Sequence, residues 1–203
     1  RLYHKKKSEE AAKHGIFIYH IFEYEWNTKR EQIKAQLRNL LGKNGFKIYA
    51  RKCDVRVIDN MAKQRFLEEN HLQGNDSSSV KLGLFYQDEL VSVMTFCKPG
   101  FNKKYEWELS RFCSDWGCNV VGGASKLFSY FVKNYAPSSI ISYSNNAHTR
   151  GGLYGKLGFK LNGVSNPDYI WFKSGKIVPR YQAQKHRLLE QGYQGGSESD
   201  IMH

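Results

Sequence analysis

The sequence predicts an α/β (α+β) fold with a mixed central sheet flanked by helices, and three observations support this class. Strand-like apolar segments alternate with helix-like segments over residues 47–173. Two strand-like segments flank Gln87-Asp88, a two-residue link typical of a β-hairpin. Further along, Gly122-Gly123 joins an apolar segment to a helix-like run that ends near Tyr135. The order of these segments is more informative than the two glycines alone.

The expected elements can be placed in order along the chain. Residues 8–14 predict the end of a helix stopped by Gly15, and the dense apolar run 16–22 predicts a strand buried on both faces. Asn27 or Thr28 can cap the next helix, and Glu31 lies three residues after Thr28, which is the spacing of a capping box. The remaining elements are a strand 47–58, a helix from its cap Asp59 to Asn70, strands 80–86, 89–96 and 107–113, a helix 124–134, a strand 139–143, a helix 152–157, strands 159–161 and 169–173, and a basic helix 182–191.

Composition limits the classes of partner. The chain has 203 residues, of which 40% are hydrophobic and 14% aromatic, enough for a core of one large domain or one domain with an appended piece. A formal net charge of +12 favours an anionic partner, with nucleic acid as the first candidate and a basic protein without such a role as the alternative. We find no run of about 18 apolar residues and no signal peptide, so we expect no membrane partner and a cytoplasmic location.

The four cysteines do not predict a metal site. Cys53, Cys97, Cys113 and Cys118 form no CxxC pair, which makes a zinc knuckle unfavourable. A bridge between Cys113 and Cys118 is conceivable, but their apolar, strand-like surroundings favour reduced thiols of a cytosolic protein.

The turn at residues 121–125 predicts an anion-binding site. Val121, Gly122, Gly123, Ala124 and Ser125 lie where a strand leads into a helix, so backbone N–H groups and the positive end of the helix can face a phosphate. The alternative is a tight strand-to-helix connection without a ligand.

Residues 47–173 resemble the GNAT acyltransferase family in the order of their elements, down to the short helix that ends in Tyr154-Gly155-Lys156-Leu157-Gly158-Phe159. The resemblance implies that residues 121–125 bind the pyrophosphate of acetyl-CoA or a related acyl-CoA. The family pattern is partly met, because Cys118 or Asn119 stands where Arg or Gln is usual.

Within that fold, the chain is similar to the Mom-like family of phage DNA-modification proteins. The residues that carry the likeness are polar positions at the ends of the expected elements. They include His71 after the helix that ends at Asn70, Arg111 near the end of the strand 107–113, Asn145 after the strand 139–143, and Tyr154 in the helix 152–157. The resemblance implies that Arg111 and Asn145 hold a DNA base, that His71 assists deprotonation, and that Tyr154 is the general acid. Mom-like proteins usually have Asp at the place of Asn145, and an amide cannot be a base.

Each of these residues also has a structural interpretation. Arg111 could be a buried cation paired with Glu106 or Glu108. His71 could be a cation at a helix C-terminus, and Tyr154 could belong to the core. Iron is associated with Mom-like proteins, but His71 is the only well-placed candidate ligand and one imidazole does not define a metal site.

Residues 1–44 resemble the end of Vsr-like (EDxHD) phage homing endonucleases, through the basic run Tyr3 to Lys7 and the segment Gly15 to Trp26. The resemblance implies a nuclease segment upstream in the same native polypeptide, whose acidic metal ligands are not in this sequence. The predicted organisation is therefore a nuclease tail at 1–44, a GNAT-like domain at 45–175 and a basic C-terminal helix and tail at 176–203.

The basic tail is the predicted DNA contact. Arg180, Tyr181, Lys185 and Arg187 combine phosphate-binding cations with an aromatic ring that can stack on a base, although a solvated helix explains them equally well. Taken together, these features predict a phage protein inside a bacterial host that binds double-stranded DNA and transfers a group from an acyl-CoA-type donor to a DNA base. The alternative is a non-catalytic DNA-binding module of a Vsr-like homing endonuclease.

Overall fold

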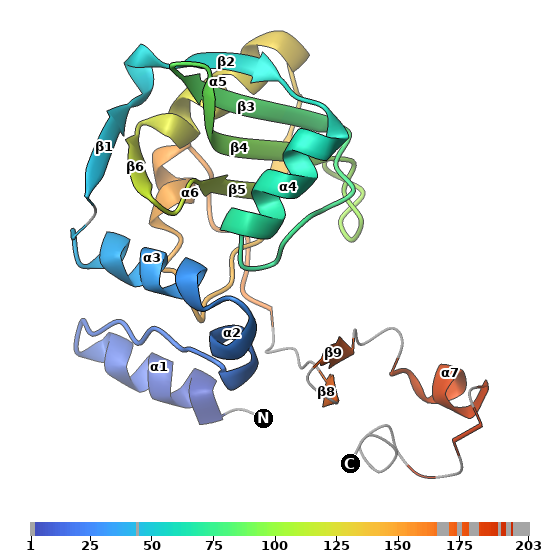
Figure 1. The fold of residues 1–203 in the computed structure, drawn as a ribbon. Coiled ribbons are helices and arrows are strands. Elements are labelled where there is room, and N and C mark those ends of the chain that lie inside the picture. The colour runs from blue at the N-terminus through green and yellow to red at the C-terminus, as the bar shows by residue number, and fades with distance from the viewer. Residues whose placement is uncertain are drawn as a thin grey trace. The chain divides into compact units, whose positions relative to one another are not determined.

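A five-stranded mixed sheet forms the centre of the larger part of the chain (Figure 1). Neighbouring strands of this sheet run antiparallel, except for the last pair in the spatial order, which is parallel. In spatial order the strands are β2 (Asp54–Val57), β3 (Val80–Tyr86), β4 (Glu89–Cys97), β5 (Trp107–Ser114) and β7 (Ile140–Ser142). The predicted α/β class with a mixed central sheet is confirmed.

The structure is a computed structural model that describes residues 3–43, 45–165, 171–173, 176–178, 183–190, 192–193 and 196. The chain divides into two compact units, one spanning 29–161 and one comprising 1–28 with 162–203. The helix α3 (Arg30–Leu40) belongs to the larger unit, whereas the predicted organisation placed it in the N-terminal segment 1–44. The ammonium of Lys29 and the amide of Gln32 hold this helix to α4 through the backbone oxygens of Glu68 and Glu69.

Helices cover both faces of the sheet. The helix α5 (Gly123–Tyr135) packs Leu127 and Phe131 against one face, where the rings of Phe96 and Phe131 stack with centroids 3.5 Å apart. The helix α4 (Asn60–Asn70) packs Phe66 and Leu67 against Val93 on the other face. Each such buried side chain contributes about 1.5–3 kcal/mol of hydrophobic free energy. The packing of α5 on one face and α4 on the other therefore stabilises a helix–sheet–helix arrangement.

The first helix of the larger predicted domain begins as expected. The carboxylate of Asp59 accepts a hydrogen bond from the backbone N–H of Ala62 at 2.8 Å, and this cap starts α4. The helix buries four positions at helical spacing, which are Lys63, Phe66, Leu67 and Asn70. Two of the four are polar, so this helix carries hydrogen-bonding groups into the interior.

The hairpin is also confirmed. β3 and β4 meet at Gln87 and Asp88, whose φ angles of 49° and 64° are the left-handed pair of a two-residue hairpin turn. Between β4 and β5 the register shifts at Ser110, because Thr95 faces Arg111 whereas Phe96 faces Leu109. Ser110 is therefore the extra residue of a β-bulge.

The predicted single strand 47–58 is wrong. The segment forms β1 (Phe46–Tyr49), a 3₁₀ turn η1 (Ala50–Lys52) and then β2. β1 pairs in parallel with β6 (Cys118–Val121), a strand that the sequence did not predict, whereas β2 pairs with β3. The chain must turn at η1 because its two halves join different sheets.

The smaller unit contains α1 (Tyr3–Lys13), α2 (Glu23–Thr28), the hairpin β8 (Trp171–Lys173) and β9 (Lys176–Val178), and α7 (Lys185–Glu190). The predicted strand 16–22 is wrong, since this run has no partner strand among the described residues. It lies instead along α1, where His20 Nε2 and Ser8 Oγ are 2.7 Å apart.

Two further local predictions were wrong. Thr28 ends α2 by donating to the backbone oxygen of Tyr24, so it does not cap the next helix. Residues 159–161, which follow α6 (Gly152–Lys156), are not a strand. Within the described residues, no helix has the length and apolar character needed to cross a membrane.

Candidate functional site

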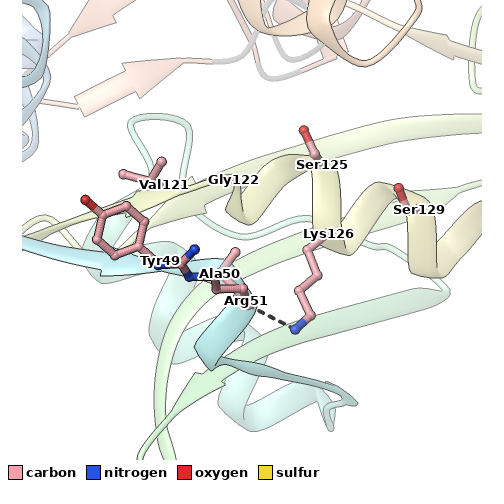
Figure 2. A pocket seen from close by; sticks show the side chains of 8 residues that line it. All are labelled: Tyr49, Ala50, Arg51, Val121, Gly122, Ser125, Lys126 and Ser129. Carbon is pink, nitrogen blue, oxygen red and sulfur yellow. Dashed lines mark hydrogen bonds between the residues drawn. The ribbon is translucent and has the colours of Figure 1, made fainter.

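A cavity of about 360 Å³ lies at the start of α5 (Figure 2). The backbone of Gly122 has a φ of 79°, a left-handed conformation that favours glycine and turns β6 into the helix. The lining residues come from β1 and η1 on one side and from the turn and first two turns of α5 on the other; they are Tyr49, Ala50, Arg51, Val121, Gly122, Ser125, Lys126 and Ser129. None of these side chains is acidic, so the cavity suits an anion.

The second glycine has a packing role. Gly123 is buried, and a Cβ at that position would lie 2.9 Å from Cγ1 of Val120. Any larger residue would push α5 away from β6. Of the five residues predicted to bind a cofactor, Val121, Gly122 and Ser125 line the cavity, whereas Gly123 and Ala124 are buried behind it.

Lys126 makes its hydrogen bonds within the protein. Its ammonium donates to the backbone oxygen of Ala50 at 2.9 Å and also to that of Cys53. Figure 2 shows its side chain extending toward Ala50 and Arg51, away from the direction taken by Ser125 and Ser129. Of the two cationic residues that line the cavity in the described part of the chain, Arg51 is the one whose side chain makes no hydrogen bond there; it is exposed, and its guanidinium carbon lies 5.3 Å from the ring centroid of Tyr49.

β5 continues beyond its pairing with β7. The two strands pair only from Trp107–Ile140 to Leu109–Ser142, and the hydroxyl of Ser142 donates to the backbone oxygen of Leu109 at 2.8 Å. Residues 110–114 run on from the bulge and are all half-buried, although β5 is not at the edge of the sheet. The edge of β5 that points toward β7 thus has no partner strand there among the described residues.

A buried polar cluster lies on the α4 face of the sheet, and we call it the Asp76 cluster. It consists of Asp76, Lys63, Ser78, Thr95 and Ser110. The carboxylate accepts hydrogen bonds from Thr95 at 2.7 Å, Ser78 at 2.9 Å and Lys63 at 3.1 Å. Burial raises the pKa of Asp76, but the bonds from Thr95, Ser110, Ser78 and Lys63 outweigh it and hold the pKa below its ordinary value. Asp76 is ionised and saturated, so its role is structural.

His71 and Arg111 meet beside this cluster. Burial, followed by the nearby charge of Arg111, lowers the pKa of His71 to about 4, so the ring is neutral at pH 7. This rules out the interpretation of His71 as a helix C-terminal cation. Nδ1 of His71 accepts the backbone N–H of Gln73 at 3.1 Å, which leaves the proton on Nε2.

Arg111 makes no ion pair within the described part of the chain. One guanidinium nitrogen donates to the backbone oxygen of Ser110 at 2.9 Å, and the buried Nε has no hydrogen-bond partner. Neither Glu106 nor Glu108 pairs with Arg111, and the carboxylate of Glu106 accepts the backbone N–H and the hydroxyl of Ser138 instead. A buried N–H donor without a partner is costly, and an acceptor from a ligand would satisfy it.

Asn145 and Tyr154 lie near each other at the end of β7. The Tyr154 hydroxyl donates to the backbone oxygen of Tyr143 at 3.4 Å, and the ring of Tyr154 contacts that of Phe159. The carbonyl of Asn145 accepts the backbone N–H of Ala147 at 3.0 Å, which closes the turn after the strand. No hydrogen bond joins this pair of residues to His71 or Arg111 in the described part of the chain.

Glu108 and Cys97 lie between the two pairs. Glu108 is close enough to raise the pKa values of both the Cys97 thiol and the Tyr143 hydroxyl, after burial, which is the larger cause for each. The charges of Asp76 and Arg111 also act on Cys97. Glu108 therefore lies near both Cys97 on β4 and Tyr143, the residue whose backbone oxygen accepts the hydroxyl of Tyr154.

The positive charge is concentrated in the larger unit. Residues 29–161 contain 21 lysines and arginines against 11 aspartates and glutamates, a formal +10 of the total +12. Of the residues predicted to contact DNA, Lys185 and Arg187 are exposed on α7, whereas Arg180 and Tyr181 lie outside the described residues. The charge distribution therefore favours residues 29–161, rather than the tail, as the part that would contact an anionic partner.

The described residues do not fit an iron centre. They bring no group of three or more His, Cys, Asp or Glu side chains together in a way that could hold a metal ion. All four cysteines are free thiols.

The sequence interpretation missed Lys63, Asp76 and Thr95. One signal was available, because Lys63 occupies a position on the apolar stripe of its helix with Phe66 and Leu67. Nothing in the sequence indicates that Asp76 and Thr95 meet, since their contact requires the loop after α4 to fold over the sheet.

No family model and no curated protein sequence matches this chain.

Proposed function

We propose that this protein is a GNAT-like transferase that uses an acyl-CoA-type donor to modify an amine of a base in double-stranded DNA. The observation that carries the proposal is the cavity at Gly122, which lies where β6 turns into α5 and has no acidic lining residue. A further support is that β5 pairs with β7 over only three residues, so that its edge beyond Leu109 has no partner strand among the described residues.

The donor would be held by the protein backbone. The N–H groups around Gly122 and the hydroxyls of Ser125 and Ser129 would donate hydrogen bonds to its pyrophosphate, and Arg51 would contact a further phosphate. The free edge of β5 after Leu109 offers backbone groups for the extended amide-containing arm of a CoA molecule.

An acyl-CoA supplies a thioester carbonyl when it is bound. The amine of the base would form the new C–N bond as the C–S bond breaks, and the displaced proton of the amine would pass to water. Tyr154 would donate its hydroxyl proton to the departing sulfur. Arg111 would hold an acceptor of the substrate through its unpartnered Nε, and His71 would donate from Nε2. Assistance by His71 as a base is not part of the proposal, because its neutral ring carries the proton on the free nitrogen.

Isothermal titration with acetyl-CoA tests the donor site. We expect the wild type to bind and Ser125→Glu to weaken binding at least about tenfold, roughly 1.4 kcal/mol, because the new carboxylate repels the pyrophosphate. Gln64→Glu makes the same change of charge on an exposed face of α4 and should bind like the wild type. Absence of binding by the wild type would remove the donor from the proposal.

Transfer itself is measured by mass spectrometry of nucleosides from duplex DNA incubated with the protein and acetyl-CoA. We expect one base to gain the mass of an acyl group, and Tyr154→Phe to reduce the yield with little change in acetyl-CoA affinity.

A second candidate function is a non-catalytic DNA-binding module. It is favoured by Asn145, whose carbonyl closes a local turn and whose amide cannot act as a base. This function predicts duplex binding that weakens steeply with salt but no modified base under any donor condition.

A further inference from the structure

The loop between β4 and β5 carries the most exposed of the large apolar side chains in the described part of the chain. Phe101 is 92% exposed. The loop residues 98–105 also contain Lys98, Lys103 and Lys104 and no acid. An aromatic ring that stands in solvent among cations is a poor packing element and a good contact for a polyanion with stacked rings.

The base of this loop is firmly held. The ammonium of Lys98 donates to the backbone oxygen of Glu106 at 3.3 Å and lies 4.2 Å from the ring centroid of Trp107. The carboxylate of Glu106 accepts the backbone N–H of Ser138 at 2.7 Å. Phe101 is therefore presented from an anchored loop.

Phe101 also lies beside the candidate catalytic residues. Its ring meets that of Tyr143 edge to face, with centroids 6.3 Å apart at 80°. The backbone oxygen of the same Tyr143 accepts the hydroxyl of Tyr154. A base displaced by Phe101 would thus leave its duplex next to the end of β7, where Asn145 and Tyr154 lie.

We propose that Phe101 is a wedge that enters the base stack of double-stranded DNA and displaces the target base, while Lys103 and Lys104 contact the flanking phosphates. The inference rests on the proposed function in taking duplex DNA as the partner. A base amine within a duplex is out of reach of an active site, so an enzyme of this kind must unstack its substrate. Apolar side chains inserted between base steps do this in other proteins that deform DNA.

Fluorescence of 2-aminopurine tests the wedge without any acyl donor. Four duplexes that carry this base in different contexts are saturated with protein, and their binding is followed separately by anisotropy. We expect a fluorescence increase in at least one duplex with the wild type and with Phe101→Trp. Phe101→Ala should lose that increase while its affinity falls less than about threefold. Leu161→Ala, which removes another highly exposed apolar side chain, should behave like the wild type.

The salt dependence of duplex binding tests the roles of Lys103 and Lys104. The pair Lys103→Ala and Lys104→Ala should reduce the slope of log affinity against log salt by about 2, since each phosphate contact contributes about 0.9. A fluorescence increase that persists in Phe101→Ala, or no increase with bound wild type, would overturn the wedge. Failure of the wild type to bind duplex, with Phe101-dependent binding to vesicles containing phosphatidylserine, would overturn it in favour of a membrane contact. Unstacking of the base without its modification would support the wedge and contradict the proposed transferase activity.

Discussion

Nδ1 of His71 accepts a hydrogen bond from the backbone N–H of Gln73 over 3.1 Å. The bond requires an unprotonated Nδ1, and the half-buried ring lies beside the cationic Arg111. Protonation of His71 would therefore break a backbone contact and add a second charge next to the first.

The first prediction concerns stability against pH. The pKa of His71 is about 4 in the folded protein against 6.5 in the unfolded chain, so between these values only the unfolded chain takes up the proton. Stability should fall as the pH is lowered from 6.5 to 4, by on the order of 3 kcal/mol. Urea unfolding of wild type and His71→Asn, which keeps an acceptor for Gln73, measures the difference. Equal pH dependence of the two proteins would contradict the prediction.

The second prediction concerns the buried ion pair. Lys63 and Asp76 have nearly no exposed side-chain surface, and each is the other's charge partner. Asp76→Asn should destabilise the protein by about 3–5 kcal/mol, because it leaves the Lys63 ammonium buried without a counter-charge. Adding Lys63→Met should recover part of the loss in denaturant unfolding. Additive effects of the two changes would show that the pair is not coupled.

In the wild type, the contribution of Asp76 should be fully present above the unfolded pKa of 3.8 and lost as the pH falls through the lower folded value. This window lies below that of His71, so acid titration of stability should separate the two groups.

The third prediction concerns Lys126. Its replacement by Met leaves the backbone oxygens of Ala50 and Cys53 without their donor, at a cost of about 1–3 kcal/mol. Calorimetry should show a melting temperature several degrees lower. Lys133→Met on the exposed side of the same helix is the control and should change it little. The wall formed by η1 should also loosen, so acetyl-CoA affinity should fall together with stability.

The fourth prediction concerns the hairpin turn. Gln87 and Asp88 both have left-handed backbone angles that Asn and Gly adopt more readily. The double change Gln87→Asn and Asp88→Gly should stabilise the protein by about 1 kcal/mol, measured as a higher urea midpoint. The lost contact between Asp88 and Arg56 is exposed and should matter little. A lower midpoint would mean that this contact outweighs the backbone strain.

Local interactions explain which elements could be predicted. The cap at Asp59 and the turn at Gln87-Asp88 each depend on residues within four positions of one another, so sequence patterns identify them. The run 16–22 and the segment 47–58 look like strands because they are apolar. Whether an apolar segment becomes a strand depends on a partner strand, which the local sequence does not contain.

The candidate site divides in the same way. The left-handed Gly122 and the helix start at residues 121–125 were visible in the sequence, because a turn of this kind is a local device. The other wall of the cavity comes from Tyr49 and Arg51, some 70 positions away. It exists because β1 pairs in parallel with β6, and that pairing follows from packing of the whole unit.

The sequence by itself determined the α/β class, the hairpin, the capped helix α4 and the small-residue turn before α5, since each is encoded by neighbouring residues. Only the tertiary structure decided that His71 is neutral beside Arg111, that Asp76 is saturated by Lys63 and Thr95, and that Phe101 stands next to Tyr143. These relationships join segments distant in the chain, and their energies depend on burial and separation, which are properties of the folded protein alone.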